Sequence, residues 1–142
     1  MIRSNAYRET QVTTATPQQL HLMVVEGAIR AATLAEQAME KGDFEGAHLA
    51  LSNARDFVAE LISGLIEERA PELVGKMKGL FVFVYRNLAD ADRERDIKRV
   101  RDALKILRIH HETWLSQIER LNASQTTGPS VTTPDAPRSW MT

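Results

Sequence analysis

Histidine and carboxylate side chains are the groups of this 142-residue chain that could hold a metal ion or move a proton. The histidines are His21, His48, His110 and His111. Glu45-x-x-His48 matches half of the signature that carboxylate-bridged di-metal sites use in helical bundles. A complete site needs a second such pair and inward-facing carboxylates on two further helices, and the sequence has no second Glu-x-x-His. We therefore expect neither a metal site nor a cofactor.

Other catalytic patterns are also missing from the sequence. It has no Gly-rich phosphate loop, no Gly-x-Ser-x-Gly, no His-Glu-x-x-His and no Ser/His/Asp set that one pocket could collect. His111 falls at a core-type position, where a hydrogen-bonded interior or boundary histidine is more usual than a catalyst. We expect that the protein is not an enzyme.

A run of basic side chains could in principle bind phosphate groups. Its members are Arg93, Arg95, Lys98, Arg99, Arg101, Lys105 and Arg108. Acidic residues are interleaved with them, from Asp92 to Asp102, which is typical of a solvated helix face with many ion pairs. We favour the solvated face, so we expect no nucleic-acid partner.

Composition places the chain among single-domain globular proteins. Hydrophobic residues make up 43% and charged residues 26%, the formal net charge is -1, and cysteine is absent. The net charge gives no general attraction to nucleic acid or to an anionic membrane. No apolar run approaches the roughly 20 residues of a membrane span, and the N-terminus has no apolar signal segment. We expect a cytoplasmic protein without membrane insertion.

Apolar residues recur at alternating steps of three and four, which keeps one side of a helix facing a neighbour. The first stripe is Leu20, Val24, Gly27, Ala31, Leu34 and Ala38. The second is Phe44, Ala47, Leu51, Ala54, Val58, Leu61 and Leu65. The third is Leu73, Met77, Leu80, Val84, Leu88 and Ala91. The fourth is Ile97, Val100, Leu104, Leu107, His111, Trp114, Ile118 and Leu121.

Capping residues divide these stripes into helices. Thr16-Pro17 with Gln19 predicts one helix start, Asp43 a second and Pro71 a third. Residues 92–95 are expected to form a turn, after which Asp96 caps the fourth helix. Short joints between helices of similar length predict an all-α, antiparallel up-down four-helix bundle over residues 16–121. Residues 1–15 are expected to form an irregular N-terminal arm. Residues 122–142, rich in Ser, Thr and Pro, are expected to be a disordered C-terminal tail.

Small residues surround Gly27 in the first helix, which suggests that another helix approaches closely there. Two other segments carry more apolar residues than one buried stripe requires, namely 22–25 and the six-residue run 80–85. The surplus fits helices buried on several sides, a homodimer face, or a groove for an amphipathic partner segment. The arm favours the groove, because Tyr7 and Val12 could shield apolar surface until a partner binds.

Several short segments also match a known family in order and spacing. They are Asn5-Ala6-Tyr7, Val12, Thr14-Ala15-Thr16-Pro17-Gln18-Gln19-Leu20, Met23 and Glu26-Gly27-Ala28-Ile29. Further along come Lys41-Gly42-Asp43, Leu80-Phe81, Leu107 and Thr113-Trp114. Over about residues 5–120 the chain resembles the flagellin-specific export chaperones, the FliS family. It departs from the family at Val24-Val25-Glu26, where Leu, an aromatic residue and Asp are usual, and at Val82, where an acidic residue is usual.

The resemblance implies a cytoplasmic bundle that binds the C-terminal segment of flagellin, prevents premature polymerisation and delivers flagellin to the type III export gate. It assigns Tyr7 and Val12 to the arm, and makes Leu20, Met23 and Val24 candidate groove residues. The apolar surplus adds Phe81, Val82, Phe83 and Tyr85 as candidate partner-binding residues. The alternative is a structural or adaptor bundle that forms a homodimer through its third helix, and a homodimer of the free chaperone also stays open.

Overall fold

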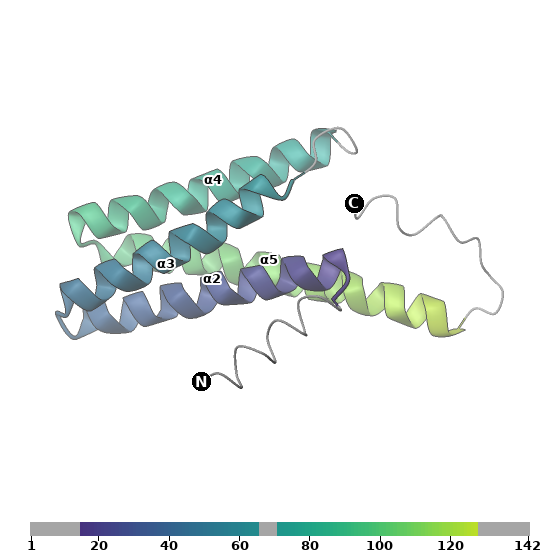
Figure 1. Cartoon of the computed structure of the whole chain (residues 1–142), viewed down its shortest axis with the longest axis horizontal. Helices are drawn as coiled ribbons and strands as arrows, with labels where there is room; N and C mark the ends of the chain where they lie inside the picture. Colours follow the sequence, from purple (N-terminus) through teal and green to yellow (C-terminus); the bar gives the residue numbers. More distant parts are fainter. Residues whose placement is uncertain (1–14, 66–70, 128–142) are drawn as a thin grey trace.

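The computed structural model describes residues 15–65 and 71–127, and within these ranges it contains helices and no strand. The helices are α2 (Pro17–Glu40), α3 (Phe44–Ser63), α4 (Pro71–Glu94) and α5 (Ile97–Thr127). Each helix packs antiparallel to the next, and α5 returns to pack against α2 (Figure 1). The predicted all-α, up-down four-helix bundle is therefore confirmed.

Caps fix the helix ends where the sequence predicts them. The Thr16 hydroxyl accepts from the Gln19 backbone N–H at 3.1 Å, and the Gln19 side chain accepts from the Thr16 N–H at 3.0 Å. This reciprocal pair satisfies backbone donors that an uncapped helix leaves unbonded. The Asp43 carboxylate caps α3 by accepting from Gly46 N–H at 2.9 Å. Gly42 has φ of +76°, so the tight joint between α2 and α3 requires a residue without a side chain there.

Two predicted helix ends differ from the observed ones. The turn expected at residues 92–95 is mostly helical, because α4 continues to Glu94, and only Arg95, with φ of +55°, and Asp96 separate it from α5. The last helix does not end at Leu121 but continues to Thr127. The start of the expected tail therefore belongs to α5, and residues 128–142 lie outside the described residues. No described helix is both long enough and apolar enough to span a bilayer.

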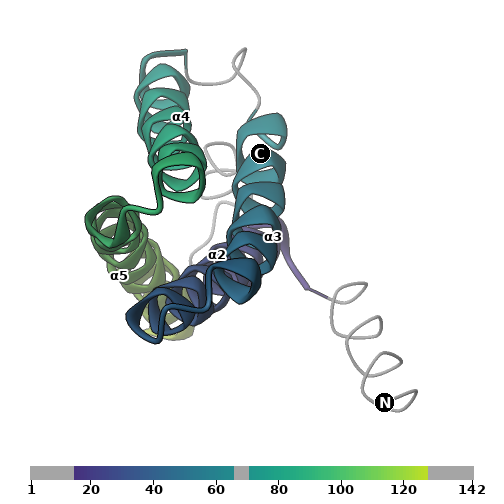
Figure 2. The ribbon, with the colours of Figure 1, turned by 90° about the vertical axis from the view of Figure 1, so that its left-hand side faces the viewer.

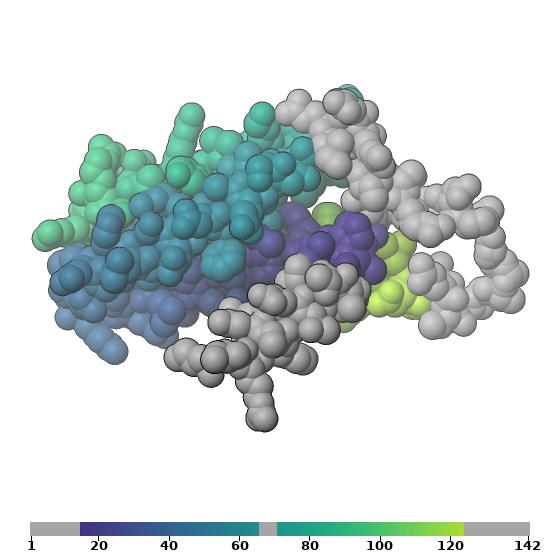
Figure 3. All heavy atoms as spheres, viewed as in Figure 1, coloured from purple at the N-terminus to yellow at the C-terminus, as the bar shows by residue number. Residues whose placement is uncertain are grey.

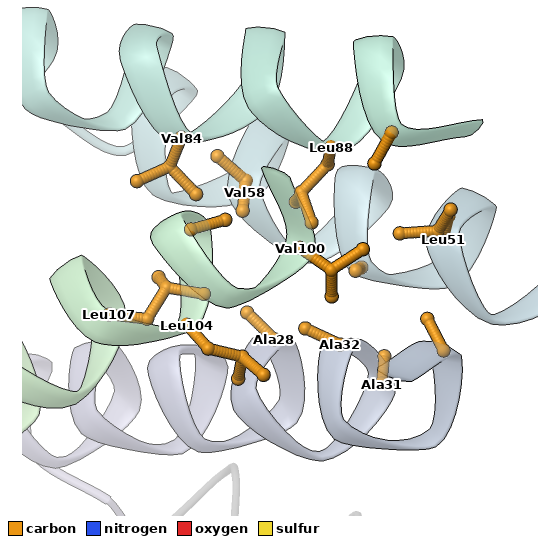
Figure 4. Packing of buried hydrophobic residues seen from close by; sticks show 14 of the residues in the cluster. Ala28, Ala31, Ala32, Leu51, Val58, Val84, Leu88, Val100, Leu104 and Leu107 are labelled. Carbon is orange, nitrogen blue, oxygen red and sulfur yellow. The ribbon is translucent and has the colours of Figure 1, made fainter. Parts of the chain in front are cut away.

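The core lies between all four helices and follows the second and fourth stripes closely (Figure 4). Its largest fully buried side chains are Phe81, Leu51, Leu88, Leu104, Leu107, Val25, Val58, Val84 and Val100. On α2 the buried side is made of small residues, Ala28, Ala31, Ala32 and Ala35, rather than of large ones. These alanines let α3 and α5 approach α2 closely.

Three leucines of the predicted stripes are exposed instead of buried. Leu34 on α2 is 60% exposed, and Leu73 and Leu80 on α4 are 48% and 36% exposed. In the first part of α4, Val74 and Phe81 take the core places predicted for these two leucines, whereas Val84, Leu88 and Ala91 are buried as predicted. A continuous apolar run does not define which side of a helix is buried, so packing against the neighbouring helices decides which residues face the core.

At Gly27 a side chain of α3 packs directly against the backbone of α2, so the close approach that the sequence suggests is present. A Cβ atom at this position would lie 2.6 Å from Cε1 of Phe57. The ring of Phe57 therefore occupies the space that any side chain at residue 27 would need.

Replacing Gly27 by alanine is expected to lower the free energy of unfolding by about 1–3 kcal/mol, because the Phe57 ring must move out of its packed position. In a Phe57→Leu background the same replacement is expected to raise it by up to about 1 kcal/mol, because alanine is the better helix former. Urea unfolding of the four proteins of this double-mutant cycle measures both effects. The same sign in both backgrounds would show that the ring is not the obstacle.

Candidate functional site

The groove residues expected in the first helix lie together near its start. Leu20, Met23 and Val24 are half-buried, so each presents apolar surface without entering the core fully. Met23 and Val24 precede Gly27 by four and three residues, which puts them on the side of α2 that faces α3. We call Leu20, Met23 and Val24 the α2 edge.

The run 80–85 on α4 points in several directions rather than to one groove. Successive residues on a helix are rotated by about 100°, so six in a row surround the helix. Phe81 is fully buried with 0% exposure, which corrects its assignment to a partner-binding surface: in the free protein its ring is a core side chain. Phe83 is 52% exposed and Tyr85 37%, while Val82 is half-buried.

The two groups of candidate residues do not form one groove. The helix α2 packs against α3 and α5, and α4 packs against the same two helices, so α2 and α4 lie diagonally across the bundle (Figure 2). The α2 edge and the exposed part of α4 are therefore separate surfaces.

Exposed apolar side chains on α4 share one side of the helix. Leu73, Leu80 and Phe83 follow each other at steps of seven and three, which places them on one stripe. Asp90 continues that stripe from Phe83 by seven residues, and its carboxylate lies 3.4 Å from Nη1 of Arg99 on α5. The stripe therefore runs along the junction of α4 with α5.

The facing part of α5 is apolar too. In the antiparallel pair of α4 and α5, Asp90 lies beside Arg99 and Phe81 lies beside His110. The same alignment of the two helices places Ile106 of α5 level with Phe83 of α4. Ile106 is half-buried, and Ile109, one turn further along, is 56% exposed. We call Leu73, Leu80, Phe83, Ile106 and Ile109 the α4–α5 face.

A cluster of rings closes the bundle between α2 and α5. Nε2 of His21 lies 2.8 Å from Nε2 of His110, so one neutral ring donates a hydrogen bond to the other. The His21 ring centroid is 4.3 Å from that of Trp114, and His110 meets Phe81 edge-on at 5.0 Å. The indole N–H of Trp114 donates to the Gln18 carbonyl at 3.1 Å.

Burial makes the histidine pair hard to protonate. Burial is the main cause that lowers the pKa of His21 from 6.5 to about 4, and His110 lowers it further. Burial also lowers the pKa of His110 to about 4, with His111 as the second cause. Both rings are therefore neutral at pH 7, so that Nε2 of one ring can accept the N–H of the other.

Sequence reasoning missed the pairing of His21 with His110. It singled out His111, which is half-buried at the boundary as expected, with Nε2 3.0 Å from a carboxylate oxygen of Glu26. A signal for the missed pair was available, because His21 precedes the core residue Val25 by four positions and His110 follows Leu107 by three. Each ring therefore flanks the core on its own helix.

The Glu45-x-x-His48 motif, which matches half of a di-metal signature, lies far from these surfaces, near the joint of α4 with α5. A hollow of about 310 Å³ there is lined by Met39, Phe44, Glu45, Ala47, His48, Asp92 and Arg95. Nδ1 of His48 lies 2.7 Å from the Asp92 carboxylate, which Arg55 also contacts at 3.2 Å. Within residues 15–65 and 71–127, no three potential ligands are grouped so that they could hold a metal ion.

The basic run of α4 and α5 forms a solvated face with ion pairs, as predicted. Arg93 contacts Asp90 at 2.8 Å, Lys98 contacts Asp102 at 3.3 Å, and Arg101 contacts Glu36 of α2 at 2.9 Å. Carboxylates therefore neutralise much of this face, and most of these pairs are too exposed to add much stability.

The arm residues Tyr7 and Val12 lie outside the described residues, so their assignment stays a prediction from sequence. Among the described parts of the chain, the structure offers two apolar surfaces, the α2 edge and the α4–α5 face. Figure 3 shows the start of α2 (purple) at the surface of the molecule below the end of α3 (teal). Both surfaces suit binding of an extended or helical polypeptide more than binding of a small molecule.

Comparisons with known proteins point to one family. The family described as "Flagellar protein FliS" matches residues 2–121. The flagellar secretion chaperone FliS of Bacillus subtilis is 30% identical over 114 residues, which cover 80% of this chain and 84% of the relative. The protein of the same name from Salmonella typhimurium is 29% identical over 107 residues, covering 75% and 79%. That of Escherichia coli is 27% identical over 107 residues, again covering 75% and 79%.

Proposed function

The chain belongs to the FliS family of flagellar secretion chaperones, and from this premise we propose that it binds the C-terminal segment of flagellin in the cytoplasm. By covering that segment it prevents premature polymerisation, and it delivers flagellin to the export gate. Binding of this kind involves no catalytic step. The observation that carries the proposal is apolar surface on two diagonal helices, the α2 edge and the α4–α5 face.

Separated surfaces suit a client that is unfolded before it assembles. A flexible chain loses conformational entropy when it binds, so a large apolar contact is needed to offset that cost. An extended segment can reach around the bundle from the α2 edge to the α4–α5 face, which a folded domain of fixed shape could not do without a matching cleft. The proposed contact therefore comprises Leu20, Met23 and Val24 of the α2 edge and Phe83 of the α4–α5 face, with Tyr7 and Val12 of the arm. The candidates Val82 and Tyr85 lie on other sides of α4 and belong to neither surface.

A titration of the purified chaperone with flagellin tests the proposal. Full-length flagellin is expected to bind in calorimetry, and flagellin that lacks its C-terminal segment is expected not to bind. Equal binding of both forms would contradict the assigned client segment. A free protein that is a tight dimer in light scattering and ignores flagellin would instead support the structural or adaptor bundle.

A charge placed on the α2 edge should weaken this binding specifically. Met23→Glu is expected to lower the affinity for flagellin at least tenfold, because it would bring a carboxylate into an apolar contact. Leu49→Glu is the matched control, since Leu49 is 62% exposed on the outer side of α3 and belongs to neither surface. Circular dichroism should show equal helicity in both variants, and equal affinities would remove the α2 edge from the contact.

A further inference from the structure

The joints α2–α3 and α4–α5 lie at the same end of the bundle and share a hydrogen bond but not a residue type (Figure 1). In each joint an aspartate N–H donates back to a carbonyl of the helix that ends there, at 2.8 Å in the first and 3.1 Å in the second. This bond is typical of the Schellman motif, in which the residue before the donor is left-handed and usually glycine. The first joint has Gly42, with φ of +76°, whereas the second has Arg95, with φ of +55°.

An arginine at this position costs free energy that a glycine would not, because its Cβ is crowded in the left-handed region. The side chain is exposed, and among the described residues it is paired with no carboxylate. Its Cζ lies 4.8 Å from the centroid of the Phe44 ring. Backbone strain at a residue with an unpaired charge points to a function of the side chain itself.

Arg95 borders the hollow of about 310 Å³ between the two joints. The wall of this hollow is apolar and consists of Met39, Phe44 and Ala47. The side chains of Glu45, His48 and Arg95 are exposed, so the hollow opens at the surface of the molecule.

The remaining residue of the hollow, Asp92, does not supply a partner for Arg95. Its carboxylate is held by Nδ1 of His48 at 2.7 Å and by Nη1 of Arg55 at 3.2 Å. The guanidinium of Arg95 can therefore receive a carboxylate from another molecule through two parallel hydrogen bonds. A phosphate group, with nearly two negative charges, would be repelled more strongly by Asp92 and Glu45.

We propose that this hollow binds an acidic side chain of a partner polypeptide other than the client, with the carboxylate on Arg95 and a neighbouring apolar side chain against the wall. A shallow hollow of this size covers one or two side chains, whereas sites for free small molecules enclose most of the ligand. Met39 lies 15 residues after Val24 on α2, about 22 Å at 1.5 Å per residue. A partner in the hollow therefore does not compete with a client on the α2 edge, and the inference goes beyond the proposed function.

An NMR titration of the isotope-labelled full chain with the blocked dipeptide acetyl-Leu-Glu-amide tests the proposal. Saturable shifts are expected at Phe44, His48 and Arg95. The uncharged counterpart acetyl-Leu-Gln-amide should bind about fivefold or more weakly, because it offers no carboxylate to the guanidinium. Glu45→Gln should strengthen binding of the acidic peptide by about twofold or more, because it removes a like charge from the rim.

Replacing Arg95 by glycine separates binding from a structural role. The shifts should disappear, while resistance to urea should be equal or higher, because glycine suits the positive φ. Arg93→Gln is the matched control: it removes the same charge from an exposed position two residues away, and the affinity for the peptide should stay within about twofold. Flagellin affinity of Arg95→Gly in calorimetry should equal that of the original protein.

Several results would overturn the inference. Absence of saturable shifts, or equal binding by Arg95→Gly, would exclude the site. Equal binding of glutarate would indicate a site for free organic acids, and equal binding of inorganic phosphate an unselective anion site. A marked loss of stability in Arg95→Gly would show that the arginine holds the joint against Phe44. A fall in its flagellin affinity would place the hollow in the client contact. Failure of the original protein to bind flagellin would refute the proposed function and leave the peptide result as it is.

Discussion

Replacing Phe81 by alanine is expected to lower the free energy of unfolding by about 3–5 kcal/mol. The ring is fully buried, and it packs edge-on against His110 at a centroid distance of 5.0 Å. Its removal leaves a cavity between α4 and the ring cluster that closes α2 against α5, and the surrounding helices can collapse only partly. A domain of this size has a total stability of roughly 5–15 kcal/mol, so the loss would be a large part of it.

Phe83→Ala provides the comparison, because the same ring is removed two residues away. Phe83 is 52% exposed, so its loss is expected to change stability by no more than about 0.5 kcal/mol. Urea unfolding followed by circular dichroism measures both variants. Similar losses in the two would mean that the buried side of α4 is assigned incorrectly. Flagellin affinity should show the opposite order of importance, with Phe83 contributing directly.

Acid is expected to destabilise the fold through the histidine pair. Unfolded histidines have a pKa near 6.5, whereas the pKa of folded His21 and His110 is about 4, so the unfolded state binds protons first as the pH falls. The stabilisation is complete above pH 6.5 and is lost as the pH drops from 6.5 through 4. For the coupled, partly exposed pair we expect a loss of about 2–3 kcal/mol over this window.

The dependence of stability on pH is obtained from the free energy of unfolding, measured in urea at several pH values between 7 and 4. We call the change of this free energy with pH the slope. The double variant His21→Gln/His110→Gln should show a flatter dependence, because glutamine does not titrate. Asn53→Gln, which changes a non-titrating side chain at an exposed position on α3, is the control and should leave the pH dependence as it is. Identical slopes in all three proteins would exclude the pair as the source of acid sensitivity.

Sequence reasoning was most successful where apolar and polar residues alternate clearly. On α3, the buried residues Ala47, Leu51, Ala54, Val58 and Leu61 are those of the predicted stripe. On α4, all six residues of the run 80–85 are apolar, so the sequence does not show which side of the helix is buried. Packing against the neighbouring helices decides that Phe81 faces inward and Leu80 outward. The extension of α5 to Thr127 was missed because residues 122–127 carry no apolar stripe.

For the candidate site, prediction from the sequence was limited in a different way. A square bundle with short joints already places its first and third helices on a diagonal, so one groove shared by Met23 and Phe83 conflicts with the predicted fold. Family resemblance supplied the residues of α2, but not their position relative to α4. Spacing places His21 and His110 next to core residues of their own helices, but it does not pair them, because their contact depends on how α2 and α5 pack.

The diagonal arrangement of α2 and α4 has a kinetic consequence for any chain held at both surfaces. Such a chain is bivalent: once one part is bound, the other is kept at a high effective concentration near its own surface. Each half of the attachment can be weak and short-lived while the pair remains tight. The client can then dissociate stepwise, leaving one surface before the other. A competitor that captures one end first can therefore strip off the whole segment without displacing both halves at once.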